Sequence, residues 1–242
     1  MSTLQALIAA VRAKGVDDAA VADRQARWSK GHDALVARKQ GQVDEALAKD
    51  TISPIGLCAT LGDVLPDNTI YIDETITSRR PIIEHIDFKG PLSFFSVASG
   101  GLGQGLGLAL GAKLAMKDRP VVSVIGDGSF MYNPVTQSLA LSEHKDIPIM
   151  IVVFNNAGYS AMRKEHHAYY PDGVAAASNA SVGHDITDVD YAELGKPFGF
   201  YGRRVEALAD LPGVLKEAYA ATQEGRTAIV NVILDEGAPA TR

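Results

Sequence analysis

Two stretches of sequence decide the fold of this chain, PVVSVIGDGS at residues 120–129 and PIMIVVFNNAGY at residues 148–159. Each begins with an apolar, β-rich run that does not alternate with polar residues, which is typical of a strand buried on both faces of a parallel sheet. Each run ends in glycine and polar residues, and 26 residues separate Gly128 from Asn155. Because that spacing holds a loop, one helix and the next strand, we expect the two strands to be neighbours.

Strand and helix patterns alternate outward from these runs. They predict an α/β fold, with a mostly parallel sheet and helices on both faces. Strands are expected at residues 69–73, 120–125, 148–154 and 227–234, and helices at 102–116, 134–143, 191–197 and 208–223. Ser53 and Pro54 are typical of the first residues of a further helix. The polar segment 166–188 is rich in Ala, Ser and Gly, and we expect a surface loop there.

The N-terminal residues differ from the rest of the chain. Residues 1–15 are amphipathic, and residues 17–50 contain apolar residues at roughly helical spacing, which predicts one or two helices. The apolar positions are Leu4, Leu7, Ile8, Val11, Trp28, Leu35, Val36, Val43 and Leu47. We therefore expect a helical linker or docking segment at residues 1–52, followed by the α/β domain at residues 53–242.

Composition narrows the class of protein. The chain is 46% hydrophobic and 21% charged with a formal net charge of −6, so it is neither mainly disordered nor a broadly basic nucleic-acid binder. It has no apolar run of about 18–20 residues that could span a membrane. The only cysteine, Cys58, lies in an apolar run, where we expect a buried thiol. One cysteine cannot provide a cysteine-bound zinc or iron–sulfur site within this chain. We expect a cytoplasmic protein.

The carboxyl ends of the two buried strands carry residues suited to binding a metal and a phosphate. Asp127 and Asn156 are expected to converge there, and carboxylate, amide and carbonyl oxygens suit Mg2+ or Ca2+. Gly126 and Gly128 allow the backbone to approach a phosphate closely. We expect a helix beginning near residues 133–134 to direct its N-terminal dipole toward such an anion.

The GDG motif, followed after 26 residues by NN, resembles the signature of thiamine diphosphate-dependent enzymes. The resemblance extends from about Pro54 to Leu234, and it is to the diphosphate-binding domain of the branch containing benzoylformate decarboxylase and acetolactate synthase. It implies that three residues bind Mg2+, namely Asp127, Asn156 and, through its carbonyl, Gly158. It also implies that Gly128, Ser129 and Tyr159 bind the diphosphate.

A glycine-rich stretch at residues 100–107 supports the resemblance. A glycine-rich dinucleotide loop is the alternative interpretation, but no acidic residue follows at the end of a second Rossmann strand. The resemblance implies that Leu102 lies beneath the cofactor and holds it bent, while the carbonyl of Gly100 accepts a hydrogen bond from the pyrimidine amino group. A third patch follows the first expected strand, and there the resemblance implies diphosphate contacts from Thr75, Ile76 and Thr77.

The glutamate that activates the cofactor in this family belongs to a pyrimidine-binding domain, and no residue of this chain matches it. We therefore expect a split enzyme, in which a second polypeptide supplies that domain and the assembly contains at least two copies of each subunit. A domain excised from a longer gene is the alternative.

The expected activity is decarboxylation or carboligation of 2-oxo acids or related acyl donors. An acetolactate synthase-like transferase, the β subunit of a 2-oxo acid oxidoreductase and a non-enzymatic cofactor-binding module are the alternatives.

Few residues indicate the substrate. Pyruvate decarboxylases of this family carry a glutamate where this chain has Met162, beside Ala161, which favours an apolar acyl pocket or a carboligase. A lid is one interpretation of His166, His167, Tyr169 and Tyr170, and exposed loop residues are the other. His85 and His144 are expected at the surface. Arg79 and Arg80 are expected to be exposed, with a substrate carboxylate as the alternative partner.

Overall fold

A computed structural model describes residues 2–15, 17–97, 100–178, 180, 185–186 and 189–235. The chain divides into two compact units, Met1–Gln42 and Val43–Arg242. The division predicted from sequence lies ten residues later, between residues 52 and 53. Residues 51 and 52 form isolated bridges to Ala207 and Leu234. The chain therefore pairs with the sheet domain before the helix that begins at Pro54.

Among the described residues of the first unit, only Gly15 and Asp17, between its two helices, lie outside a helix. Helix α1 spans Ser2–Lys14, and α2 spans Asp18–Leu47 and continues into the second unit. The side chain of Asp17 accepts hydrogen bonds from the amides of Ala19 and Ala20, which begins α2. The expected one or two helices of residues 17–50 are therefore one. Every described residue of α1 is exposed, including its four large apolar residues.

A six-stranded sheet organises the second unit, and every pair of neighbouring strands is parallel. The strand order is β2-β1-β3-β4-β6-β5. The strands are β1 (Ile70–Glu74), β2 (Phe94–Ser96), β3 (Val121–Gly126), β4 (Met150–Asn155), β5 (Tyr201–Val205) and β6 (Ala228–Ile233). The expected neighbours β3 and β4 pair from Val122 with Met150 to Gly126 with Phe154, which confirms the fold class.

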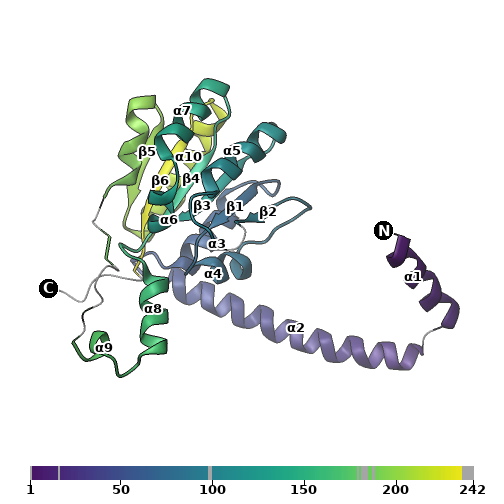
Figure 1. Cartoon of the computed structure of the whole chain (residues 1–242). Coiled ribbons are helices and arrows are strands. Elements are labelled where there is room, and N and C mark those ends of the chain that lie inside the picture. The colour runs from purple at the N-terminus through teal and green to yellow at the C-terminus, as the bar shows by residue number, and fades with distance from the viewer. Residues whose placement is uncertain are drawn as a thin grey trace. The chain divides into compact units, whose positions relative to one another are not determined.

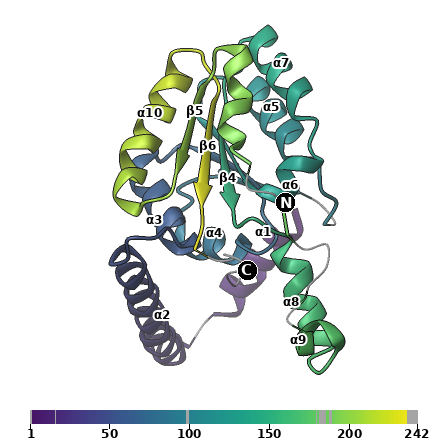
Figure 2. The ribbon, with the colours of Figure 1, turned by 90° about the vertical axis from the view of Figure 1, so that its left-hand side faces the viewer.

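Helices cover both faces of this sheet (Figures 1 and 2). The α-helices are α3 (Pro54–Val64), α4 (Arg79–His85), α5 (Gly105–Ala115), α6 (Asp127–Tyr132), α7 (Val135–Lys145), α8 (Ser160–Tyr169), α9 (Val174–Ser178) and α10 (Leu211–Gln223). Two 3₁₀ segments are η1 (Tyr191–Phe198) and η2 (Leu208–Asp210). Ser53 caps α3 as predicted, because its hydroxyl accepts a hydrogen bond from the amide of Gly56 at 3.1 Å.

The two apolar cores lie on opposite faces of the sheet, since successive strand residues alternate between them. One core joins alternate residues of β3 and β4, such as Val124 and Val152, to Leu57 of α3 and Leu215 of α10. The other joins the intervening strand residues to α5, α7 and η1. Cys58 is fully buried in the first core, as expected. Packed helices therefore cover both faces of the sheet, so we expect a ligand to bind at the carboxyl edge of the strands.

The segment 166–188 was expected to be a loop, and that prediction is wrong for much of it. Helix α8 begins at Ser160 and continues through Tyr169, and α9 covers residues 174–178. Good helix formers such as Lys, Arg, Glu and Ala occupy these stretches, while Pro171 and Gly173 separate them. Residues 179, 181–184 and 187–188 of the expected loop lie outside the described residues.

Among the described residues, no helix combines the length and apolarity needed to cross a membrane.

Candidate functional site

The carboxyl ends of β2, β1, β3 and β4 lie side by side in the sheet, and the segments that follow them line a cavity of about 260 Å³. All fourteen residues assigned to a site from the sequence line it, in four segments. They are Thr75, Ile76 and Thr77; Gly100 and Leu102; Gly126, Asp127, Gly128 and Ser129; and Asn156, Gly158, Tyr159, Ala161 and Met162. Ser78, Phe154 and Ser160 also line the cavity and were not anticipated.

Asp127 is the only acidic residue of the cavity lining that the structure describes, and it is 3% exposed. Its Oδ1 accepts a hydrogen bond from the amide of Gly128 at 2.8 Å, and its Oδ2 accepts one from Gly158 at 3.1 Å. Burial raises the pKa of this carboxyl to about 6, against the lowering effect of the surrounding amides. A cation beside Asp127 would favour its charged form, because it would offset the cost of burial.

The two asparagines after β4 have different roles. Asn155 organises the turn: its Oδ1 accepts a hydrogen bond from the amide of Ala157 at 3.0 Å, and its Nδ2 donates to Asn231 at 3.1 Å. Ala157 has a φ of 54°, so this turn holds a non-glycine residue in a left-handed conformation. Asn156, in contrast, keeps a buried Oδ1 that has no hydrogen-bond partner among the described residues. A buried amide oxygen without a donor is a suitable metal ligand.

Gly128 is needed because an aromatic ring packs against it. A Cβ at this position would lie 2.6 Å from Cε1 of Tyr159. The Tyr159 ring also meets Tyr132 of α6 edge to face, with centroids 6.5 Å apart. Helix α6 begins at Asp127 itself, so the helix expected to start near residues 133–134 is preceded by a shorter one. The expected helix is α7, which begins at Val135.

A buried carboxylate holds the first loop of the cavity. Asp73 of β1 accepts hydrogen bonds from the amide of Thr75 at 2.8 Å and from its hydroxyl at 2.7 Å. The other oxygen of Asp73 accepts a hydrogen bond from Nε of Arg79 at 3.0 Å, and Arg79 also contacts Ser96 of β2. The guanidinium therefore has a partner within the chain, while Arg80 pairs with Glu84 on the surface.

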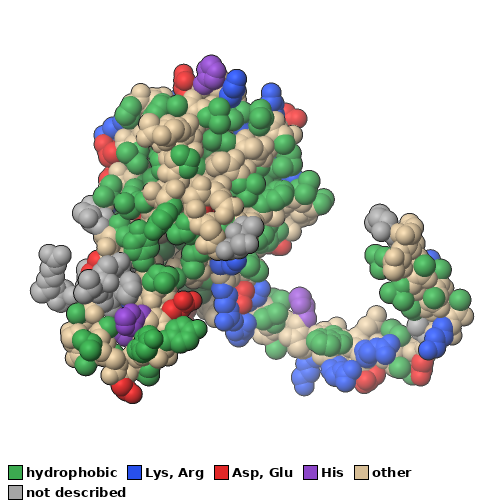
Figure 3. All heavy atoms as spheres, in the orientation of Figure 1, with side chains coloured by type: hydrophobic (Ala, Val, Ile, Leu, Met, Phe, Trp, Pro, Cys, Tyr) green, Lys and Arg blue, Asp and Glu red, His purple; other side chains and the backbone are tan. Residues whose placement is uncertain are grey.

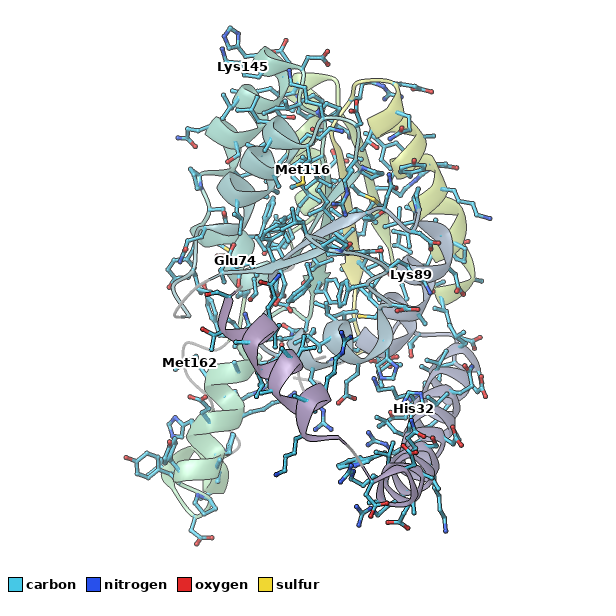
Figure 4. All side chains as sticks on the ribbon, turned by 90° about the vertical axis from the view of Figure 1, so that its right-hand side faces the viewer. His32, Glu74, Lys89, Met116, Lys145 and Met162 are labelled. Carbon is cyan, nitrogen blue, oxygen red and sulfur yellow. The ribbon has the colours of Figure 1, made fainter. Side chains whose placement is uncertain are left out.

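A second buried carboxylate, Glu74, was missed by the sequence analysis. It is fully buried and accepts hydrogen bonds from the amides of Gly103, Gln104 and Gly105 and from the side chain of Asn133. The only sequence signal was an acidic residue at the end of a buried strand in a chain that also contains a glycine-rich loop. Glu74 and Met162 both lie at the carboxyl end of the sheet (Figure 4).

The family model for the thiamine pyrophosphate enzyme C-terminal TPP binding domain matches residues 78–232, which is more than half of the chain. This chain belongs to the thiamine pyrophosphate enzymes. Curated relatives include benzoylformate decarboxylase of Pseudomonas aeruginosa, with 30% identity over 64% of this chain and 28% of the relative. 2-Hydroxyacyl-CoA lyase 2 of Bos taurus is 29% identical over 76% of this chain and 28% of its own length.

A probable acetolactate synthase large subunit of Methanococcus aeolicus is 29% identical over 67% of this chain and 26% of the relative. Among solved structures, the thiamine diphosphate-dependent 4-hydroxybenzoylformate decarboxylase of Rhodococcus jostii has a TM-score of 0.65 and 29% identity, covering 78% of this chain and 34% of that one. This chain thus spans between a quarter and about a third of the proteins it resembles. It is a thiamine pyrophosphate-binding domain of the decarboxylase and acetolactate synthase type.

The residues present fit thiamine pyrophosphate bound through a divalent metal. No group of three or more His, Cys, Asp or Glu in the described part of the chain could bind a metal, so a metal would depend on Asp127, on neutral oxygens and on the phosphates themselves. The unpartnered Oδ1 of Asn156 and the glycines beside Asp127 provide such neutral ligands and close backbone approach.

The part of the cavity lined by α8 includes apolar side chains. Ala161 and Met162 come from the first turn of α8, and Met162 is 56% exposed. Hydrophobic side chains gather on the surface around α6 and α8 (Figure 3). His166, His167, Tyr169 and Tyr170 lie farther along α8 or just after it and do not line the cavity. A lid role for them stays a prediction. His144 is exposed, and His85 is half-buried.

Proposed function

We propose that this chain is the diphosphate-binding subunit of a split thiamine diphosphate-dependent enzyme that decarboxylates or ligates 2-oxo acids. A separate polypeptide would supply the pyrimidine-binding domain and the activating glutamate. The observation that carries the proposal is the cavity at the carboxyl edge of the sheet. There, the segments after four neighbouring strands bring together an acidic residue, an unpartnered amide oxygen and a half-buried leucine.

Asp127, Asn156 and the carbonyl of Gly158 would hold Mg2+. The raised pKa of Asp127 supports this role, because burial disfavours the charged carboxylate and a cation bound beside it would offset that cost. The orphan Oδ1 of Asn156 supports it independently. Asp127 also contacts the amide of Gly158, so two of these residues are already connected before metal binds.

The diphosphate would lie between two loops. Thr75 and Thr77 carry hydroxyl groups at one wall of the cavity, and Ser129 carries one at the other. Both the amide and the hydroxyl of Thr75 already donate to Asp73, so we assign the backbone amide of Ile76 and the side chain of Thr77 as the donors on that side. Gly128 and Tyr159 complete the opposite wall. Binding through Mg2+ needs few charged residues, which agrees with the weakly acidic chain.

When bound, thiamine diphosphate supplies the electron sink for the carbanion left after CO2 departs. The residues of this chain shape and orient that group. Leu102 is half-buried in the cavity wall and would act as an apolar wedge beneath the cofactor. Gly100, with a φ of 66°, would present its carbonyl to the pyrimidine amino group.

The substrate is proposed to be a 2-oxo acid or a related acyl donor with an apolar acyl group. Ala161 and Met162 support this, since they place apolar atoms where the pyruvate decarboxylases of this family have a glutamate. An acetolactate synthase-like acyl transferase is the second candidate. The similarity to the probable acetolactate synthase large subunit of Methanococcus aeolicus supports it.

A partner subunit is supported by the size and rim of the cavity. Its volume of about 260 Å³ is below the range of roughly 300–1,000 Å³ typical of sites that enclose a ligand. Two large apolar side chains of its lining, Ile76 and Met162, are 48% and 56% exposed. A second chain that covers this rim would bury them and enclose the cofactor, and two copies of each chain would build two paired sites.

Calorimetry and activity measurements test the proposal. The chain should bind thiamine diphosphate only in the presence of Mg2+, and NAD should not bind. Mixed with the product of the neighbouring reading frame, it should release CO2 from 2-oxo acids such as benzoylformate or pyruvate. Failure to bind thiamine diphosphate with Mg2+ would contradict the cofactor assignment. Decarboxylation by the chain alone, with no second polypeptide, would contradict the split arrangement.

A further inference from the structure

Two successive acidic residues end β1, and the pleat of the strand sends them to opposite faces of the sheet. Asp73 and Glu74 are both fully buried. Asp73 holds the loop at residues 75–79 through Thr75 and Arg79. Glu74 reaches the other way, to the glycine-rich loop at residues 100–104 and the start of α5. One strand end therefore anchors two different walls of the cavity.

Four N–H groups of uncharged residues surround the Glu74 carboxylate. Its Oε1 accepts from the amides of Gly103 at 2.6 Å and Gln104 at 3.0 Å. Its Oε2 accepts from the amide of Gly105 at 2.9 Å and from Nδ2 of Asn133 at 2.7 Å. Both oxygens act as acceptors for two donors each, so the ionised carboxylate satisfies all four groups. Hydrogen bonds to a charged acceptor are among the stronger ones in proteins.

Glu74 replaces a local cap for α5. Gln104, at the N-cap of this helix, makes no side-chain capping bond to it, and the first amides of a helix have no intrahelical acceptor. Glu74 accepts hydrogen bonds from the amides of Gly103, Gln104 and Gly105. The next amide, that of Leu106, donates to Oδ1 of Asn133 at 3.1 Å. A carboxylate at this position also interacts favourably with the helix dipole.

The glycines of this loop are explained by these contacts. A Cβ at Gly105 would lie 2.6 Å from Oε2 of Glu74. At Gly103, which has a φ of 96°, a Cβ would lie 2.8 Å from the carbonyl oxygen of Tyr132 in α6. Both glycines make room for neighbouring protein atoms. Gly107, two residues beyond Gly105 on α5, has nothing within 4 Å of the same position.

The network also reaches the opposite wall of the cavity. Asn133 donates to Glu74 and, at 2.8 Å, to the carbonyl oxygen of Ser129. Ser129 lines the cavity beside Asp127. Leu102 directly precedes Gly103, whose amide donates to Glu74. Through Glu74 and Asn133, the segment that carries Leu102 is thus connected to the segment that carries Asp127.

We propose that Glu74 is a positioning residue: its carboxylate fixes the loop that carries Gly100 and Leu102, and thereby sets the wall that shapes the organic part of the cofactor. Asp73 separately fixes the wall at residues 75–79 that faces the diphosphate. The role of Leu102 in this inference rests on the proposed function, whereas the fixing of the loop by Glu74 does not. We therefore expect replacement of Glu74 and replacement of Asp73 to cause different defects.

The first experiment measures hydrogen–deuterium exchange of the ligand-free chain, comparing Glu74→Gln with Asp73→Asn. Glutamine retains the size of Glu74, but its NH2 group faces N–H donors. Loss of bonds to a charged acceptor should speed exchange at residues 103–105 by about 10- to 100-fold, with residues 75–79 unchanged. Asp73→Asn should instead speed exchange at residues 75–79 and leave exchange at residues 103–105 unchanged. Unchanged exchange at residues 103–105 in folded Glu74→Gln would overturn the inference.

The second experiment measures binding of two probes in the presence of Mg2+, inorganic pyrophosphate and thiamine diphosphate. Glu74→Gln should bind pyrophosphate like the wild type but lose about ten-fold or more of its affinity for thiamine diphosphate, equivalent to one bond to a charged acceptor. Asp73→Asn should weaken both probes equally. Equal weakening of both probes by Glu74→Gln would overturn the positioning role. If the wild type binds neither probe, the proposed function fails, while the exchange result still decides whether Glu74 fixes the loop.

A second pair of variants covers the possibility that Glu74→Gln does not fold. Gly105→Ala keeps the carboxylate but places a methyl group against it, so it should reproduce faster exchange at residues 103–105 and the selective loss of thiamine diphosphate affinity. Gly107→Ala is the matched control on the same helix, and it should behave like the wild type in both measurements. Identical behaviour of the two alanine variants would contradict the inference.

Discussion

Replacing Asp127 with asparagine should make the stability of the metal-free chain less dependent on pH. Burial raises the pKa of this carboxyl from 3.8 to about 6. The folded state therefore holds a proton that the unfolded state has already released between these values, so the free energy of unfolding falls as pH rises through this window. A difference of about two pKa units at 1.36 kcal/mol each corresponds to roughly 3 kcal/mol, lost in full above pH 6. Asparagine does not titrate and should escape this loss.

The amide variant has a cost of its own that does not depend on pH. Asp127 accepts hydrogen bonds from the amides of Gly128 and Gly158 through different oxygens, and asparagine retains one acceptor oxygen. One unsatisfied amide costs about 1–3 kcal/mol. The free energy of unfolding of the variant at a single pH is therefore not informative. The informative quantity is how the difference in this free energy between wild type and Asp127→Asn changes with pH.

Urea unfolding of wild type and Asp127→Asn at pH 4, 5, 6 and 7, without metal, measures that difference. It should shift by about 2–3 kcal/mol in favour of the variant between pH 4 and pH 7. The same variant should fail to bind Mg2+ with thiamine diphosphate at every pH. A difference that stays constant from pH 4 to pH 7 would show that burial does not shift this carboxyl, and the argument for a cation beside it would fail.

The remaining predictions concern binding, turnover and assembly. Asn156→Ala should weaken Mg2+-dependent cofactor binding strongly but change stability by less than about 1 kcal/mol, because its buried Oδ1 has no partner to lose among the described residues; calorimetry and urea unfolding together test this, and a strongly destabilised variant would contradict it. Leu102→Ala should reduce turnover of the assembled enzyme more than cofactor affinity, which steady-state kinetics with thermal melts would reveal, and wild-type turnover in a folded variant would refute the wedge. Gly128→Ala should displace the ring of Tyr159, since the new methyl group would lie 2.6 Å from it, and near-ultraviolet circular dichroism should change; an unaltered spectrum would count against this packing. Light scattering after size-exclusion chromatography should show a hetero-oligomer with at least two copies of each subunit, and a complex with one copy of each would disprove that stoichiometry.

The strands at the centre of the sheet were predictable and those at its edges were not. The apolar runs of β3 and β4 are continuous because helices cover both faces, and this burial is visible in the sequence. The missed strands, β2 and β5, are the two edges. β2 has three residues, and β5 includes Arg203 and Arg204. An edge strand buries less and pairs on one side only, so its composition carries a weaker signal.

The motif residues of the site were predictable because they follow buried strands whose neighbours could be inferred. Their connections were not. Glu74 binds amides 29–31 residues further along the chain, and no local pattern announces a contact of that range. Asn155 and Asn156 are identical residues in one motif, yet one organises the turn and the other keeps its oxygen unpartnered. Only the direction of each side chain separates these roles.

The adjacency of Asp73 and Glu74 also constrains how this family member can evolve. β1 lies between β2 and β3, with Asp73 beside Val124 and Glu74 beside Ile125. Adding or deleting one residue in the strand would send each carboxylate to the wrong face of the sheet. Both loops would lose their anchors in a single mutational event, although neither loop had changed. We therefore expect insertions and deletions to be excluded from β1 and tolerated in the connections of the edge strand β5.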